Sequence, residues 1–315
     1  MDLRIFTEPQ QGASHPDQLA AARATREHGF SAYFRSDHLM AMGSRSGLPG
    51  PSDAMVSLAA LAAQVPDIRF GTLVTSATFR HPGMLAVAAA NIDDISDGRL
   101  DLGMGAGWFE VEHTAYGIPF GNSFGDRFDR LTEQLEILTG LWATPEGERF
   151  SYSGRHWTLT DSPALPKPVQ RAADGTPRIP LVIGGHGPKR TPALAARFAA
   201  DFNVAFSDLA VTTAQFARVR AACEAIGRDP AEIVYSAAQV VCVGADEAEY
   251  ERRAAAIGRE PAELRETGIA GTPDQALARI REWADAGVQR LYLQVLDLSD
   301  LDHIALLGSD VRAAL

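Results

Sequence analysis

The chain has 315 residues, of which 46% are hydrophobic and 22% charged, and a formal net charge of −11 at pH 7. This composition provides enough apolar side chains for a large core and excludes an intrinsically disordered chain. The negative charge argues against a nucleic acid or an acidic membrane surface as partner, because either would need a basic face. Two cysteines, Cys223 and Cys242, are too few for a disulfide framework or a thiolate metal site. No apolar run reaches the ~20 residues of a membrane span, and no signal-peptide pattern is present, so we expect a cytoplasmic protein.

Short apolar runs alternate with amphipathic stretches along the chain. The expected strands are residues 3–6, 31–35, 68–75, 99–104, 180–183, 202–206, 234–243 and 290–296. The expected helices are residues 18–28, 53–64, 83–95, a segment with the stripe Phe128, Leu131, Leu135, Leu138 and Trp142, then 191–199, 213–226, 245–257, and a last helix from the N-cap Thr272 to Gly287.

Eight strands separated by helices predict parallel pairing, because a parallel connection needs a long crossover. Eight such units close a (β/α)8 TIM barrel, and an open doubly wound sheet is the alternative. We expect a single domain over residues 1–315. Residues 144–178, before strand five, are rich in Pro, Gly and Ser without a helical stripe. So long a connection is usually an active-site cover, and we expect this insertion to cover the site.

In such a barrel the active site lies at the carboxyl ends of the strands, which selects the residues there. Gly105, Ala106, Gly107 and Trp108 follow strand four. Glycines at alternate positions let a ligand approach the backbone closely, although they could also serve only the bend from strand to loop. The run is not a dinucleotide fingerprint, because Trp108 stands where the third glycine would be.

The end of strand five runs into the start of a helix and combines free N–H groups with cations. It contains Gly184, Gly185, His186, Lys189 and Arg190. A helix N-terminus with flanking cations favours a phosphate, so we expect an anion cradle here. The alternative is a solvated helix start with two surface cations. The run lacks the GK[ST] ending of a P-loop, which argues against nucleotide hydrolysis.

The end of strand two presents a titratable pair, Asp37 and His38, where a general acid or base belongs. Trp108, His113 and Tyr116 could wall a flat aromatic ligand, or could pack under the insertion. No nucleophile elbow and no cysteine beside a histidine is present, so acyl transfer is unsupported. Paired carboxylates for glycoside hydrolysis stay open, because Glu8, Asp37, Glu110 and Glu112 lie near strand ends. No carboxylates or histidines cluster at metal spacing, so we expect no metal.

An ordered set of motifs resembles the bacterial luciferase-like flavin and deazaflavin oxidoreductases, and in particular the branch that uses coenzyme F420. The motifs are Ser36-Asp37-His38, the run from Gly71 to Pro82, Gly103 to Phe109 with Glu112-His113 and Tyr116-Gly117, Gly125 to Leu131, Gly184-Gly185, and Gly271-Thr272-Pro273. The resemblance spans nearly the whole chain. It implies a barrel whose mouth holds the ring of the cofactor, and a cis peptide bond between Leu73 and Val74 behind that ring.

The resemblance also implies roles for individual residues. His38 would be the acid or base in hydride transfer between F420 and a small organic substrate, and the substrate would contact Glu8, Trp108, His113 and Tyr116. The cofactor would contact Asp37, Leu73, Val74, Thr75, Gly105, Ala106, Gly107, Trp108, Gly184, Gly185, His186, Lys189 and Arg190. The sugar-phosphate dehydrogenases of this branch have a glutamate at the position of Trp108, so we expect a more apolar substrate than glucose-6-phosphate.

Three alternatives remain open on the sequence. The first is an FMN-dependent monooxygenase supplied with reduced flavin by a partner reductase. The second is a cofactor-carrying protein without turnover, and the third is a metal-assisted barrel hydrolase. The resemblance further implies a homodimer.

Overall fold

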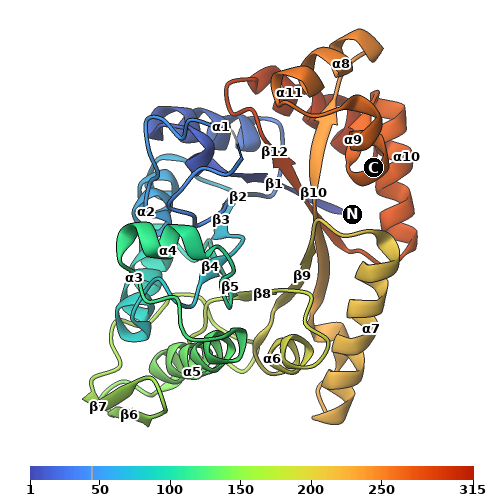
Figure 1. Cartoon of the computed structure of the whole chain (residues 1–315). Coiled ribbons are helices and arrows are strands. Elements are labelled where there is room, and N and C mark those ends of the chain that lie inside the picture. Colours follow the sequence, from blue (N-terminus) through green and yellow to red (C-terminus); the bar gives the residue numbers. More distant parts are fainter. Residues whose placement is uncertain (44) are drawn as a thin grey trace.

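Eight parallel strands form a closed ring in this computed structural model, which describes residues 1–43 and 45–315 (Figure 1). Around the ring the strands are β1 (Asp2–Thr7), β2 (Ala32–Arg35), β3 (Arg69–Thr72), β5 (Leu100–Gly105), β8 (Leu181–Gly184), β9 (Asp201–Ala205), β10 (Val234–Val243) and β12 (Arg290–Val295). Strand β12 pairs with both β10 and β1 and so closes the ring. The predicted TIM barrel is confirmed, and the open sheet is excluded.

Helices surround this ring, with small elements between them (Figure 1). The helices are α1 (His15–Glu27), α2 (Ala54–Gln64), α3 (Pro82–Ile95), α4 (Glu110–Tyr116), α5 (Phe124–Ala143), α6 (Arg190–Phe198), α7 (Leu209–Ala225), α8 (Glu247–Ala256), α9 (Pro261–Thr267), α10 (Pro273–Asp285) and α11 (Leu301–Leu306). Short 3-10 helices lie at Pro9–Gln11, Pro230–Glu232 and Arg312–Ala314, and a π-helical turn at Leu307–Val311. A further parallel strand, β11 (Ile269–Gly271), pairs with the end of β10. None of the described helices is long and apolar enough to cross a membrane.

The expected strand over residues 68–75 is divided in two. Strand β3 ends at Thr72, and β4 (Thr75–Ser76) resumes the pairing with β5, Thr75 opposite Met104. Between them the peptide bond from Leu73 to Val74 is cis, as the family resemblance implied. Leu73 and Val74 both line the pocket described below.

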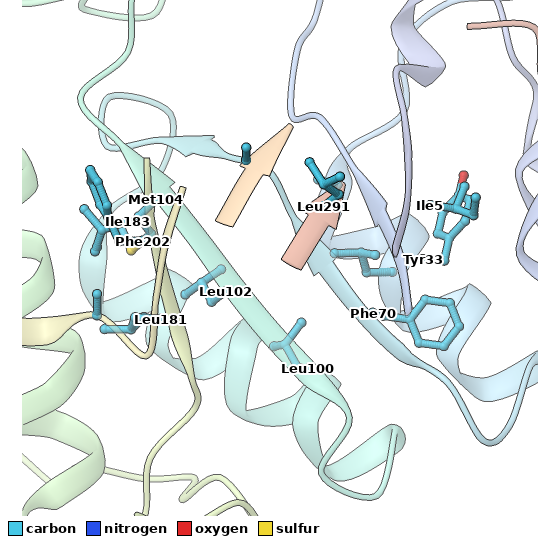
Figure 2. Packing of buried hydrophobic residues seen from close by; sticks show 14 of the residues in the cluster. Ile5, Tyr33, Phe70, Leu100, Leu102, Met104, Leu181, Ile183, Phe202 and Leu291 are labelled. Carbon is cyan, nitrogen blue, oxygen red and sulfur yellow. The ribbon is translucent and has the colours of Figure 1, made fainter. Parts of the chain in front are cut away.

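The main core lies between the barrel and the helices, because side chains alternate along each strand. On β5, Leu100, Leu102 and Met104 belong to this outer core (Figure 2). Asp101 alternates with them and faces the barrel interior, where it accepts a hydrogen bond of 2.8 Å from Arg4. The Arg4 guanidinium lies over the Phe34 ring. This polar layer fills the barrel near the start of its strands, so a pocket can open only at the other end.

None of residues 144–178 lines the pocket described below, so the expectation that this insertion covers the active site is not met. Its hairpin, β6 (Phe150–Ser153) and β7 (Thr158–Ser162), packs on the outside of α5, where the Tyr152 hydroxyl donates to Glu136 at 2.7 Å. Farther along, Gln170 bonds Asp93 at the end of α3 and the carbonyl of Leu100 at the start of β5. Apolar side chains explain this path: Phe150, Tyr152, Trp157 and Leu159 pack against the main core.

Candidate active site

A cavity of about 550 Å³ opens at the carboxyl ends of the strands. Segments that follow β1, β2, β3, β5, β8 and β9 supply its walls, together with the first turns of α5 and α6. The lining residues are Phe6, Glu8, Ser36, Asp37, His38, Met42, Leu73, Val74, Thr75, Ser76, Gly105, Ala106, Gly107, Trp108, Glu112, Phe124, Phe128, Gly184, Gly185, His186, Gly187, Thr191, Asn203, Ala205 and Phe206. The pocket is therefore mostly apolar, with a few polar groups.

His38 is held by a buried carboxylate. Its Nδ1 lies 3.0 Å from Oε1 of Glu112, a residue only 1% exposed, and Oε2 of Glu112 accepts the N–H of Leu39 at 2.8 Å. The ring edges of Trp108 and Phe109 contact the imidazole, with centroids 5.8 and 6.0 Å away. Because Nδ1 is engaged by Glu112, Nε2 is the nitrogen that can exchange a proton with a ligand in the pocket.

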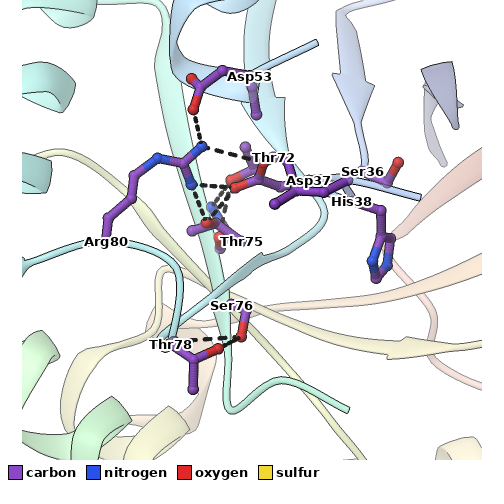
Figure 3. A network of polar contacts seen from close by, with 12 residues as sticks. Ser36, Asp37, His38, Asp53, Thr72, Thr75, Ser76, Thr78 and Arg80 are labelled. Carbon is purple, nitrogen blue, oxygen red and sulfur yellow. Dashed lines mark hydrogen bonds and ion pairs between the residues drawn. The ribbon is translucent and has the colours of Figure 1, made fainter. Parts of the chain in front are cut away.

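Asp37, the residue before His38, makes contacts that connect neighbouring segments of the protein. Its carboxylate accepts the Thr75 hydroxyl at 2.5 Å and forms an ion pair with Arg80, which also pairs with Asp53 at 2.6 Å. Figure 3 shows the Asp37 carboxylate turned toward Arg80 and the His38 ring turned the other way. Burial alone would raise the pKa of Asp37, but Arg80 holds it below the usual value. Asp37 thus lines the pocket as a fixed anion whose carboxylate is paired with Arg80.

The glycines after β5 make room mainly for protein atoms. A Cβ on Gly105 would lie 2.9 Å from the Val74 side chain, and one on Gly107 would meet the Ser76 hydroxyl at 2.2 Å. Gly107 also has a φ of +85°, which favours glycine. Both residues line the pocket, but their small size first allows the β3–β4 segment to approach β5 closely. The backbone of these glycines and the Val74 side chain together form one wall of the pocket.

The start of α6 forms a recess of backbone beside this wall. Lys189 is its N-cap residue and provides no side-chain cap, and Pro192 has no N–H. Thr191 is 1% exposed, and its hydroxyl has no hydrogen-bond partner among the described residues. The backbone of Gly187 lies close to this hydroxyl, and a Cβ on Gly187 would lie only 2.7 Å from it. An unpaired buried hydroxyl at an uncapped helix start fits an anionic group.

A third carboxyl group, Glu8, faces the pocket from the end of β1. Burial raises the pKa of Glu8, against the opposing effects of its hydrogen bond with Gln11 and of the nearby His38. The Gln11 amide donates to it at 3.3 Å. Glu8 thus adds a carboxyl group that is easier to protonate than usual.

Four of the expected contact residues do not line the pocket. Lys189 is exposed outside it, and Arg190 pairs with Asp129 at 2.6 Å. His113 is buried and its two nitrogens contact the Phe109 carbonyl and the Thr78 hydroxyl, while Tyr116 is 52% exposed on α4. The expected substrate contacts of His113 and Tyr116 are therefore corrected, because α4 turns the one inward to its own packing and the other to solvent.

The structure also adds residues that sequence patterns did not identify as ligand contacts. Phe124 and Phe128 reach the pocket from the first turn of α5, and Phe128 had counted only as part of an apolar stripe. Glu112 was visible only as one carboxylate among several. No local signal identified Met42, Thr191 or Phe206. Within the described part of the chain, no group of three or more His, Cys, Asp and Glu side chains is placed to hold a metal ion.

The fold is a (β/α)8 barrel, and its pocket combines glycine backbone with a histidine held by the buried Glu112 carboxylate. Residues 1–263 match the luciferase-like monooxygenase family, and the chain belongs to that family. It is 30% identical to the F420-dependent hydroxymycolic acid dehydrogenase of Mycobacterium tuberculosis over 290 residues, which are 86% of this chain and 74% of that protein.

Two further similarities concern part of the chain and the fold. The chain is 34% identical to the F420-dependent glucose-6-phosphate dehydrogenase of Microbacterium testaceum over 174 residues, 55% of this chain and about half (47%) of that protein. The structure of an F420-dependent secondary alcohol dehydrogenase with an F420–acetone adduct superposes with a TM-score of 0.82 at 16% identity, covering 100% of this chain and 99% of the other. At that identity it supports the fold alone.

Proposed function

We propose that this protein is an oxidoreductase that binds coenzyme F420 in the pocket and exchanges a hydride between it and a small organic substrate. The observation that carries the proposal is the His38–Glu112 pair beside the apolar wall of Leu73, Val74 and Gly105. A planar ring against that wall would be close to a histidine whose Nε2 is available for proton transfer.

The residues of the chain fit a deazaflavin. The apolar wall would hold the ring, and the uncapped start of α6, with the unpaired Thr191 hydroxyl and the Gly184–Gly187 backbone, would hold the phosphate. When bound, F420 supplies a two-electron hydride donor or acceptor. The protein then has to orient the two reactants, exclude water and hold or release one proton at Nε2 of His38.

Two relatives support this choice of cofactor, since both are named as F420-dependent dehydrogenases. The pocket differs from what a sugar phosphate needs, because none of its lining residues in the described chain is Lys or Arg. We therefore propose a substrate other than glucose-6-phosphate.

Titration of the purified protein with oxidised and reduced F420, followed by the absorbance of the cofactor, tests the proposal. Saturable binding of F420 together with weak binding of FMN is the expected result. Tight FMN binding with oxygen consumption in the presence of reduced flavin would instead identify a flavin monooxygenase. Binding of F420 without turnover on any of a broad set of alcohols and carbonyl compounds would indicate a carrier protein.

The H38A variant separates binding from chemistry. Because His38 lies beside the wall and not in it, we expect unchanged F420 affinity and a loss of turnover of about 10²–10⁴-fold. Stopped-flow reduction or oxidation of the cofactor measures the loss. Wild-type turnover in H38A would remove this histidine from the mechanism.

A further inference from the structure

Phe206 adopts an unusual backbone conformation at the pocket mouth. It follows β9 with a φ of +51°, in the left-handed region that bulky side chains rarely adopt. Three of the other four non-glycine residues with positive φ in the described chain are aspartates, a residue type that tolerates this conformation. The Phe206 N–H donates to the Ala238 carbonyl at 2.8 Å, which fixes the backbone in place. Such conformations gather at ligand-binding positions.

The ring of Phe206 lines the pocket and is half exposed, at 50%. Its centroid lies 6.5 Å from that of Phe6, which is buried at the end of β1. In the ring of strands, β9 is the fourth strand from β2, so Phe206 stands across the mouth from His38. The backbone conformation therefore directs an aromatic face into the opening instead of into the core.

Trp108 and Phe124 are the other two exposed aromatic residues among the described lining residues, at 65% and 57% exposure. By comparison, Trp142 and Trp283 are each 1% exposed. The Trp108 ring contacts that of His38 and stacks on Phe109, with centroids 5.2 Å apart. Three large apolar faces are thus left open in the pocket, that of Trp108 beside His38, and a ligand would bury hydrocarbon against them.

The charged side chains near His38 disfavour the binding of an anionic substrate. Glu8 and Glu112 both line it, and the carboxylate of Asp37 is already neutralised by Arg80. No Lys or Arg is among the described lining residues. A negatively charged substrate would thus lose hydration and gain repulsion from carboxylates without a cation to compensate.

We propose that the substrate is a neutral, largely apolar molecule with one hydroxyl or carbonyl oxygen, held between Trp108 and Phe206 with that oxygen at Nε2 of His38. The identification of this molecule as the substrate rests on the proposed F420-dependent function. The aromatic clamp, defined as Trp108 and Phe206, can be tested by binding alone.

The test measures ligand affinity of the full-length protein by calorimetry, with and without saturating F420. The probes are cyclohexanone, acetophenone and 2-octanone, each compared with an anion of similar size, 4-oxocyclohexanecarboxylate, 4-acetylbenzoate or 7-oxooctanoate. We expect at least one neutral probe to bind tenfold or more tightly than its anionic counterpart. Failure of all three neutral probes to bind, or equal binding of the anions, would overturn the proposal.

Variants then locate the binding surface. F206G should weaken binding of the neutral probe about fivefold or more while Tm stays equal to or above that of the wild type, because glycine relieves the left-handed backbone. W108L should weaken it similarly, and F206L should weaken it less. Y116A, an exposed aromatic residue outside the pocket, is the matched control and should bind as the wild type does.

The outcomes separate the two proposals. Retained affinity in F206G with a lowered Tm would assign Phe206 to packing and overturn the clamp. Clamp-dependent binding of the neutral probe without any F420 binding would keep the clamp and reject the proposed function. F420 binding with probe affinity insensitive to both aromatic residues would keep the function and reject the clamp.

Discussion

Glu112 orients the imidazole ring of His38. One carboxylate oxygen engages Nδ1 and the other accepts the Leu39 N–H, so the carboxylate fixes both the ring and the loop after β2. In E112Q the amide NH2 cannot accept from Leu39, and the negative charge beside the imidazole is lost. We expect kcat to fall about 10–100-fold with F420 affinity unchanged. E110Q, an exposed neighbour on α4, is the control; equal kcat in both variants would show that Glu112 does not position His38.

Thr191 allows the anion recess to be tested at a single atom. Because its buried hydroxyl has no partner within residues 1–43 and 45–315, T191V should leave the stability of the ligand-free protein unchanged or raise it slightly. If the hydroxyl contacts the phosphate, F420 affinity should fall about five- to tenfold, which is ~1 kcal/mol. T212V is the matched control, since that hydroxyl donates to the Asp208 carbonyl at 2.8 Å on α7. It should lose stability and keep its affinity, and the reverse pattern would argue against the recess.

At this scale the sequence placed His38 and Asp37 correctly at a strand end but could not assign their partners. Glu112 follows His38 by 74 residues, and Arg80 follows Asp37 by 43. Two adjacent titratable residues therefore have opposite surroundings, one turned to the pocket and the other to a buried cation. Only the pairing of distant segments decides this, and no local pattern contains it.

Ion pairs of Arg80 hold the segment that follows the divided strand β3–β4. Arg80 joins Asp37, at the end of β2, to Asp53 before α2, and the Gln134 amide of α5 donates to the Arg80 carbonyl at 2.8 Å. R80M would leave the Asp37 carboxylate buried without its cation, and we expect it to cost about 3–5 kcal/mol in urea unfolding. The double variant D37N/R80M removes that charge and should recover at least half of the loss. A double variant no more stable than R80M would contradict this account.

The ion pair also predicts acid sensitivity. Since Arg80 holds the pKa of Asp37 below the ordinary value of 3.8 despite burial, the pair contributes fully above that pH. Its contribution is lost as the pH falls below 3.8 toward the lowered value, because the unfolded state then binds the proton first.

Hydrophobic periodicity predicted the regular helices, but it could not predict on which surface of the barrel an irregular segment packs. The stripe from Phe128 to Trp142 lies on α5, and the 272–287 segment forms α10 with Thr272 N–H bonded to Gln275 at 2.9 Å. Residues 144–178 were expected over the pocket because so long a connection without a helical stripe is usually an active-site cover. Their four apolar residues instead pack against the main core, with the hairpin on the outside of α5, and sequence alone does not reveal which surface is available.

For the whole molecule, the count of eight strands predicted closure of the barrel, with an open sheet as the alternative that the structure excludes. What it could not predict is how the two ends differ. Near the strand starts, Asp201 accepts hydrogen bonds from Arg290 at 2.6 Å and from the Tyr292 hydroxyl at 2.8 Å, which fills the interior with paired charges. The opposite end keeps glycines and apolar side chains, and the pocket forms there. The asymmetry arises from which residue of each alternating pair points inward.

His303 makes the stability of the whole barrel depend on pH. It lies on α11, 6% exposed, and its Nε2 accepts the N–H of Val243 at the end of β10 at 3.0 Å. Burial, and then the charge of Arg253, lower its pKa from 6.5 to about 4. The folded protein therefore keeps this ring neutral, while the unfolded chain takes up a proton as the pH drops below 6.5.

The sign follows from that difference in proton uptake. The contribution of His303 is complete above pH 6.5 and declines as the pH falls toward 4, at about 1.4 kcal/mol per pH unit once the unfolded histidine is protonated. Between pH 7.5 and pH 5 we expect H303Q, whose amide oxygen can still accept the Val243 N–H, to gain about 2 kcal/mol relative to the wild type. Urea unfolding at the two pH values measures this, with the exposed H15Q as control. Parallel pH profiles for wild type and H303Q would show that the neutral ring is not the source of the dependence.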